Sequence, residues 1–180
     1  MAAAARAVLL AILLVVGGCQ ASPTVDPEDA PHSRLAPAAC DGVPPVALRG
    51  RITDAADILT PEVEASLSQR LARYQERTQH QMVVATTTDL NGVDVGNFAT
   101  CLGNRWGIGR KGHDDGIVIL LAPKEKQMRI ATGDGLRKQL TDERALSIVN
   151  RMTPRFRQGD YSGGLELGID SIAAQTGDRP

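Results

Sequence analysis

The sequence has few aromatic residues and almost no net charge. Phe, Trp and Tyr make up 3% of its 180 residues, and 20 Lys and Arg side chains nearly balance 21 Asp and Glu side chains. With so few aromatic side chains, the core must be built from aliphatic ones. The balanced charge gives no reason to expect binding to nucleic acid or a polybasic membrane contact. The composition therefore predicts an aliphatic core and no nucleic-acid partner.

Long hydrophobic runs are absent except near the N-terminus. Residues 8–16 form an apolar run behind a single charge, Arg6. The run is shorter than the roughly 20 apolar residues that a bilayer core requires, and it has the length of the apolar part of a signal peptide. No later segment is long and apolar enough to span a membrane. We therefore expect residues 1–18 to be a signal peptide and the protein to work outside the cytoplasm.

Cys19 follows the small pair Gly17 and Gly18, and this arrangement resembles the bacterial lipobox. In such signals the chain is cut before the cysteine, whose thiol is acylated. The resemblance implies a lipoprotein that begins at Cys19 and is held to a membrane by a lipid such as palmitate. Because Gln20 is not acidic, we expect the periplasmic face of the outer membrane rather than the inner membrane. An ordinary secretory signal with a chance cysteine is the alternative.

The two remaining cysteines, Cys40 and Cys101, form an even pair in a compartment where disulfides persist. We expect a disulfide between them, with two unpaired structural cysteines as the alternative. A reactive thiol at Cys101 is disfavoured because no histidine is nearby in the sequence and the residue lies in a helical apolar pattern.

Proline content divides the chain. Six of the ten prolines lie in residues 19–47, and a segment of this composition does not build a packed core. We therefore expect residues 19–47 to be a proline-rich tether and residues 48–176 to be the folded domain.

Periodicity and capping residues predict alternating strands and helices in the domain. The expected strands are residues 51–54, 81–87, 116–121 and 128–132. The expected helices follow the N-caps Thr60, Asp94 and Thr141, and a fourth begins at Asp160 or Ser162. We expect the third helix to carry Leu146, Val149 and Met152 and to end at Pro154. Strands interleaved with helices of this length predict an α/β layered domain.

Five blocks of residues resemble the TPM domain in order and spacing: Asp54 to Thr60, Trp106 to Leu121, Arg129 to Leu136, Leu140 to Asp142 and Phe156 to Tyr161. The resemblance covers about residues 48–176. It implies a small α/β/α sandwich with a short mixed sheet flanked by helices. The family includes bacterial envelope proteins, and its members have been associated with divalent-cation binding and acid phosphatase activity.

A glycine-rich segment, Gly107 to Gly112, matches the pattern G-x-G-x-x-G. Dinucleotide binding requires a strand before this pattern and a helix after it. Here the predicted helix comes first and the strand follows. We therefore expect a loop and no bound nucleotide.

Four aspartates lie at junctions between elements and loops: Asp54, Asp114, Asp115 and Asp142. Ca²⁺ and Mg²⁺ prefer carboxylate and carbonyl oxygens from more than one loop. Because the resemblance supports these four positions, we expect them to meet at one end of the sheet and bind Ca²⁺ or Mg²⁺. Solvated loop aspartates, a turn-closing Asp54 and a helix-dipole role for Asp142 are the alternatives.

The sequence does not identify a catalytic residue. There is no G-x-S-x-G motif, and His113 beside Asp114 is explained as well by a surface loop as by acid chemistry. The leading hypothesis is a lipid-anchored, cation-binding interaction module with an envelope protein partner. The alternative is a metal-assisted acid phosphatase in which Arg110 and Lys111 attract an anionic substrate. A purely structural lipoprotein is the third hypothesis.

Overall fold

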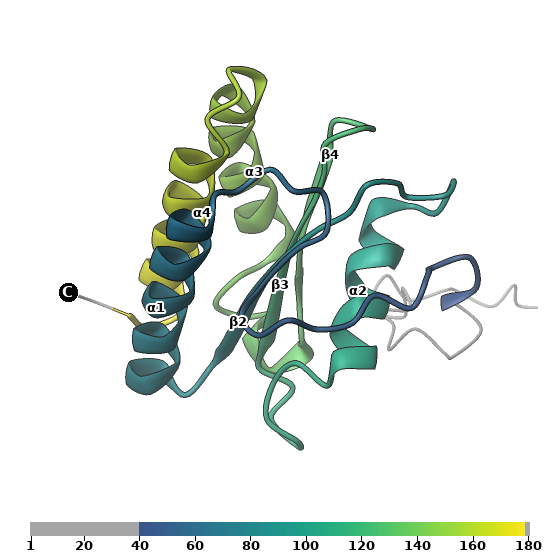
Figure 1. The fold of residues 1–180 in the computed structure, drawn as a ribbon. Helices are drawn as coiled ribbons and strands as arrows, with labels where there is room; N and C mark the ends of the chain where they lie inside the picture. The colour runs from purple at the N-terminus through teal and green to yellow at the C-terminus, as the bar shows by residue number, and fades with distance from the viewer. Residues whose placement is uncertain (1–39, 179–180) are drawn as a thin grey trace, which may run out of the picture. The chain divides into compact units, whose positions relative to one another are not determined.

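The computed structural model describes residues 40–178, so the expected signal peptide and Cys19 lie outside the described residues. The predicted α/β fold is confirmed: four strands form one mixed open sheet in the order β1-β2-β3-β4, with four α-helices around it (Figure 1). The elements are β1 (Ile52–Asp54), α1 (Pro61–Thr78), β2 (Gln81–Thr86), α2 (Val95–Trp106), β3 (Gly116–Ala122), β4 (Gln127–Thr132), the short 3-10 helix η2 (Asp134–Leu136), α3 (Asp142–Arg157) and α4 (Tyr161–Gln175).

The sheet is parallel from β1 to β3, and β4 returns antiparallel to β3. Asp54 at the end of β1 is level with Thr86 on β2, which is in turn level with Leu121 on β3. Every residue of β3 is buried. This explains its continuous apolar sequence, because a central strand covered on both faces cannot alternate with polar residues.

Helices α1, α3 and α4 cover one face of the sheet, and α2 covers the other (Figure 1). The first face packs Leu67 and Leu71 of α1 against Val84 and Ile119, and the second packs Phe98 of α2 against the opposite side of the sheet. The β1-α1-β2 and β2-α2-β3 connections move across the sheet in the same direction but cover opposite faces. The two crossovers therefore have opposite hands, and one of them is of the uncommon left-handed kind.

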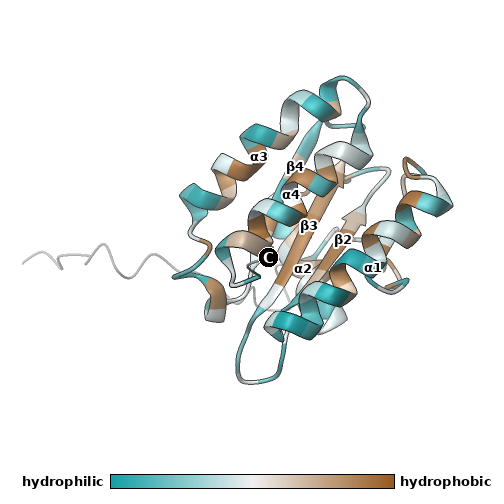
Figure 2. Ribbon diagram, turned by 90° about the vertical axis from the view of Figure 1, so that its left-hand side faces the viewer, coloured by the Kyte–Doolittle hydropathy of each residue, from teal (hydrophilic) through white to brown (hydrophobic). Residues whose placement is uncertain are grey.

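The helices begin at the predicted caps. The Thr60 side chain accepts a hydrogen bond from the Val63 N–H, and Asp94, Thr141 and Asp160 cap the later helices in the same way. On α1 the inward residues Leu67, Leu71 and Tyr74 are buried. Figure 2 shows the corresponding pattern, with hydrophilic residues on the outer surface of α1 and hydrophobic residues along β2 and β3.

Helix α3 differs from the prediction in two ways. It does not end at Pro154 but continues to Arg157. A proline removes one hydrogen bond of its own but does not prevent later residues from bonding, and here the Gln158 N–H closes the last turn on the Arg155 carbonyl. Leu146 is not part of the core, since 58% of its surface is exposed.

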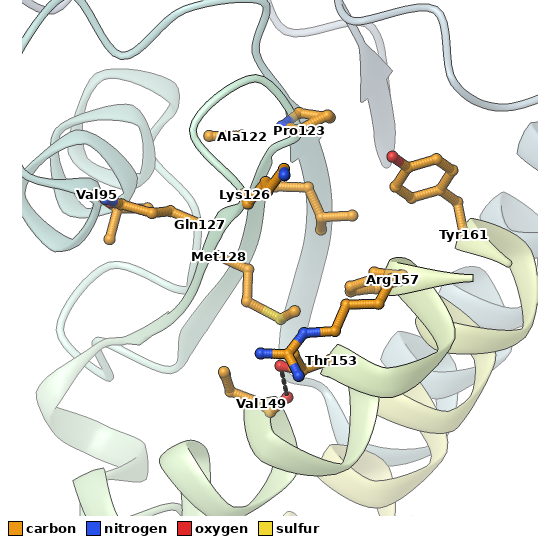
Figure 3. A pocket seen from close by; sticks show the side chains of 12 residues that line it. Val95, Ala122, Pro123, Lys126, Gln127, Met128, Val149, Thr153, Arg157 and Tyr161 are labelled. Carbon is orange, nitrogen blue, oxygen red and sulfur yellow. Dashed lines mark hydrogen bonds between the residues drawn. The ribbon is translucent and has the colours of Figure 1, made fainter. Parts of the chain in front are cut away.

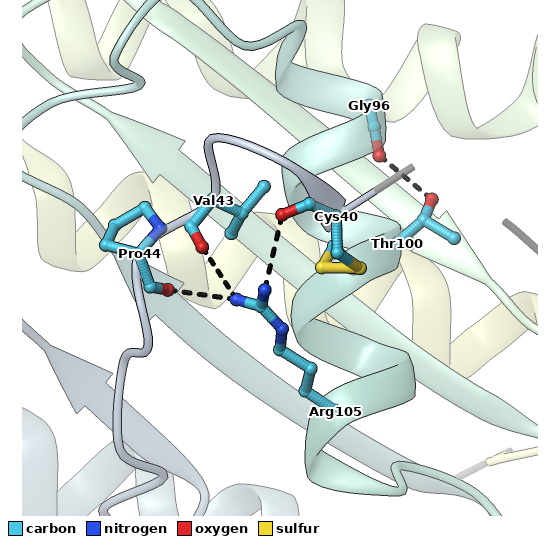
Figure 4. The surroundings of a disulfide bond; sticks show 7 residues. Cys40, Val43, Pro44, Gly96, Thr100 and Arg105 are labelled. Carbon is cyan, nitrogen blue, oxygen red and sulfur yellow. Dashed lines mark hydrogen bonds between the residues drawn. A yellow bond between two sulfur atoms is a disulfide. The ribbon is translucent and has the colours of Figure 1, made fainter. Parts of the chain in front are cut away.

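Residues 40–46, which composition places in the tether, lie against α2 (Figure 4). Cys40 and Cys101 are joined by a disulfide, with their Cα atoms 5.4 Å apart. The Arg105 guanidinium donates hydrogen bonds to the carbonyls of Cys40, Val43 and Pro44. Because the Val43 side chain is also buried, this segment is a packed part of the domain. Within residues 40–178, no helix has the length and apolarity needed to cross a membrane.

Candidate functional site

Asp54 lies at the end of β1 and closes the turn that leads to α1. One carboxylate oxygen accepts hydrogen bonds from the backbone N–H groups of Ile58 and Leu59, both at 2.8 Å. The other oxygen accepts a hydrogen bond from the Thr86 hydroxyl. Both oxygens are therefore engaged in holding the loop, which matches the turn-closing alternative for this residue.

Asp115 lies at the opposite end of the sheet, directly before β3, and only 2% of its surface is exposed. One oxygen accepts a hydrogen bond from the Arg110 backbone N–H at 2.7 Å. The other receives the Arg110 guanidinium at 2.6 Å and His80 Nδ1 at 3.1 Å. Burial alone would raise the pKa of Asp115, but these bonds from Arg110 and His80 outweigh burial and lower the pKa to about 2.

The Asp115 pairing also decides the role of Arg110. A guanidinium that is bonded to a buried carboxylate is not available to attract an anionic substrate. The proposed substrate-attracting role of Arg110 in a phosphatase therefore has no support in this geometry. His80, which the sequence places only at a strand entrance, belongs to the same cluster.

Asp114 lies in the loop before β3, and Asp142 lies at the start of α3. Asp114 adopts a backbone φ of 49°, and its carbonyl accepts a hydrogen bond from the Gly135 N–H. Asp142 is the first residue of α3 and forms an exposed ion pair with Arg129 of β4 at 3.5 Å.

The expectation that these four carboxylates meet at one end of the sheet is corrected by the strand register. Asp54 is level with Leu121, whereas Asp115 lies six residues before Leu121, so the two lie about 20 Å apart along the strand direction. Asp54 is on one edge strand and Asp142 pairs with the other, about 14 Å across the sheet. Within residues 40–178, no group of three or more His, Cys, Asp and Glu side chains is placed to hold a metal ion. The four residues do not fit a single Ca²⁺ or Mg²⁺ site.

A cavity of about 680 Å³ lies at the β3–β4 turn, between the N-terminus of α2 and the junction of α3 with α4 (Figure 3). Most of its wall is apolar, and polar side chains stand at intervals around it. Its lining is Val95, Leu121, Ala122, Pro123, Lys126, Gln127, Met128, Val149, Thr153, Phe156, Arg157 and Tyr161. The volume is within the usual range of small-ligand sites.

Two cationic side chains line this cavity. Lys126 projects from the β3–β4 turn, and Arg157 extends from the last turn of α3 toward Met128 (Figure 3). Within the described part of the chain, neither side chain forms an ion pair or a hydrogen bond. The cavity thus combines an apolar wall with two positive charges that the domain itself does not neutralise.

Close packing between α3 and α4 positions the aromatic wall. The Phe156 ring lies directly against Gly164 of α4, where an added Cβ atom would come within 2.1 Å of the ring. Phe156 also stacks on Tyr161, with ring centroids 5.7 Å apart. Glycine at 164 is therefore what allows the ring to lie at the helix junction.

Sequence reasoning did not assign this cavity. One signal was available, because two of only five aromatic residues in the chain, Phe156 and Tyr161, flank a short link between two predicted helices. Lys126 and Arg157 carry no such signal, since surface cations are common and their lack of partners appears only in three dimensions.

Comparison with known proteins gives a consistent result. A model of the TPM domain matches residues 52–175. None of the curated proteins compared with this chain matches it.

Three similar solved structures come from bacteria. The N-terminal domain of a protein from P. gingivalis has 25% identity and a TM-score of 0.65, covering 70% of this chain and 81% of its own. The N-terminal domain of the cg2496 protein from Corynebacterium glutamicum has 17% identity and a TM-score of 0.58, with coverage of 76% and 86%. The BA42 protein from Bizionia argentinensis has 21% identity and a TM-score of 0.57, with coverage of 66% and 81%. The last two show the shared fold alone. Since the family model spans well over half of the residues, the chain belongs to the TPM domain family.

Proposed function

We propose that this chain is a lipid-anchored envelope protein whose TPM domain is an interaction module, with the cavity at the β3–β4 turn as its binding site. The observation that carries the proposal is the composition of the cavity, an apolar wall with two cations that have no partner within residues 40–178. Apolar concave sites with a few convergent polar groups are where proteins usually bind ligands.

The anchoring part of the proposal rests on Cys19 after the apolar run. Acylation there would attach the domain to the membrane through residues 20–39, and the disulfide at Cys40 would be the point where this tether joins the domain. Replacing Cys19 with Ala should abolish acylation and move the protein from the membrane to the soluble envelope fraction. Equal membrane retention of the Cys19→Ala protein would contradict the anchoring proposal.

Partner binding is tested by photo-crosslinking in the intact envelope. A photoreactive amino acid replaces Gln127, which is exposed and lines the cavity, in the full-length chain. The matched control places the same amino acid at Glu76, which is exposed on α1. We expect discrete protein adducts from position 127 and none of the same size from position 76. No adduct, or identical adducts from both positions, would contradict the cavity as the binding site.

The proposal assigns no cation to the four aspartates. Asp54 and Asp115 already accept hydrogen bonds at both carboxylate oxygens, and metal-assisted phosphatase chemistry would need a cation beside the reacting phosphoryl group. Calorimetry with millimolar Ca²⁺ or Mg²⁺ provides the test. Binding that is lost both in Asp54→Ala and in Asp115→Ala would restore the single-site hypothesis and, with it, the phosphatase alternative.

A further inference from the structure

We infer that the cavity receives an acidic, apolar peptide segment of a partner protein, and that the contact extends beyond the cavity along α3 to Leu146. The inference rests on the proposed function and names the class of partner that this site fits. It is carried by two features, an apolar stripe on α3 and the sign of the charges around the cavity.

The apolar feature is the outer face of α3. Leu146 is 58% exposed, and Val149 and Thr153 follow it at spacings of three and four residues. These spacings place the three residues on one face of the helix. Val149 and Thr153 line the cavity, so Leu146 continues its apolar wall by one turn. From Leu146 to Arg157 the helix face is about 17 Å long.

The two cationic side chains at the cavity indicate the sign of the ligand's charge. Lys126 and Arg157 lie on different elements and both line the cavity (Figure 3). Cations that have no partner in the described residues favour an anionic ligand, because charge complementarity guides association and carboxylates accept charge-assisted hydrogen bonds from Lys and Arg side chains. A carboxylate next to apolar side chains satisfies both features of the site.

The length of the contact favours a peptide over a small anionic amphiphile. A molecule that only fills the cavity would leave Leu146 as exposed as it is in the free domain. A peptide of several residues can place apolar side chains on the cavity wall and on Leu146 while its acidic residues meet Lys126 and Arg157. An amphipathic peptide helix that lays its apolar face into a hydrophobic groove is one known mode of peptide recognition.

Selection from a random dodecapeptide library on the immobilised full-length chain tests the inference. We expect enriched peptides to combine apolar and acidic residues. The double variant Lys126→Glu with Arg157→Glu should bind these peptides about tenfold more weakly or worse, and should itself select basic peptides. The matched control, Arg73→Glu with Lys111→Glu, carries the same charge change on exposed side chains outside the cavity and should select the same peptides as the unmodified chain.

The contribution of Leu146 is measured separately. Leu146→Ser should weaken binding of the enriched peptides by about three- to tenfold, as for a contributing interface side chain. The control is Leu48→Ser, at the other large apolar residue that is exposed in the described chain, and it should leave affinity unchanged. Equal effects of the two variants would overturn the extension along α3.

The outcomes separate this inference from the proposed function. Enriched peptides that crosslink to position 127 but show no acidic preference would overturn the acidic class and leave the binding site intact. No enrichment, combined with saturable binding of decanoate that the double variant abolishes, would replace the peptide by an anionic amphiphile. No enrichment, no decanoate binding and no envelope crosslink would overturn both.

Discussion

The two ends of the sheet differ in how their charged side chains are used. At the start of β3, the buried Asp115 carboxylate is bonded to Arg110 and His80. At the end of β3, Lys126 and Arg157 line an apolar cavity without a partner in the described chain. A charged group whose bonds are satisfied within the domain stabilises the fold, whereas one without a partner is available to a ligand. The number of charged side chains at one end of the sheet therefore does not by itself identify the end that binds a ligand.

The largest effect is expected from breaking the Asp115 cluster. Asp115→Ala removes the buried acceptor of hydrogen bonds from the Arg110 N–H, the Arg110 guanidinium and His80, and each hydrogen bond to a charged group contributes about 1.5–3 kcal/mol. Chemical denaturation should show this loss with or without calcium. The control is Asp134→Ala, which removes an exposed ion pair with Arg137 and should cost about 0–1 kcal/mol. Equal losses in the two variants would contradict the structural role of Asp115.

The stability of the whole domain, and so of both ends of the sheet, should depend on the disulfide. The bond between Cys40 and Cys101 spans 61 residues of sequence, and closing a loop of this order stabilises a fold by about 2–4 kcal/mol. Cys40→Ala should therefore lower the free energy of unfolding by that amount in oxidising buffer. A reducing agent should destabilise the unmodified chain similarly and leave Cys40→Ala unaffected. Two free thiols in the exported protein would contradict the bond.

Acid should weaken the Asp115 cluster. The pKa of Asp115 falls from 3.8 to about 2 on folding, so its contribution is fully present above about pH 4 and is lost as pH falls toward 2. A difference of this size corresponds to about 2 kcal/mol. Denaturation curves between pH 5 and pH 2 should show a smaller decline in Asp115→Asn than in the unmodified chain. If the free energy of unfolding declines equally in both proteins, the Asp115 carboxylate is not the cause of the pH dependence.

The smallest effect on stability is expected at the cavity. The double variant Lys126→Glu with Arg157→Glu removes no ion pair found among residues 40–178 and alters only the interaction of residue 157 with the dipole of α3, so its free energy of unfolding should change by about 1 kcal/mol or less. Thermal denaturation provides the measurement. A loss of several kcal/mol would show that these cations stabilise the fold, and the contrast between the two ends would disappear.

Local rules were enough to predict most of the fold. Caps such as Thr60 and Asp94 fix where helices begin, and the continuous apolar run of β3 marks a central strand. The end and the buried face of helix α3 were harder to predict. Pro154 ends a helix only if no later turn can form its hydrogen bonds, and here one does. The exposure of Leu146 depends on which face of α3 packs against α4.

The site was less predictable for a physical reason. Asp54 ends β1 whereas Asp115 precedes β3, and the parallel pairing of these strands, which the sequence alone does not specify, places the two residues at opposite ends of the sheet. The cavity depends on contacts between distant residues, including the Phe156 ring against Gly164. Whether a cation such as Arg157 has a partner is likewise a property of the folded chain, and no local pattern reports it.

The contrast between the two ends is tested most directly by NMR titration of the full-length chain with phenylacetate, a small probe that joins an apolar ring to a carboxylate. Met128 lines the cavity, whereas Met82 and Met152 are buried in the core. We expect a saturable shift of the Met128 methyl signal, absent with benzylamine and in the Lys126→Glu, Arg157→Glu variant, with the Arg110 and Asp115 amides unmoved. Shifts at the Asp115 end, or no saturable shift at Met128, would contradict the assignment of the cavity as the binding end.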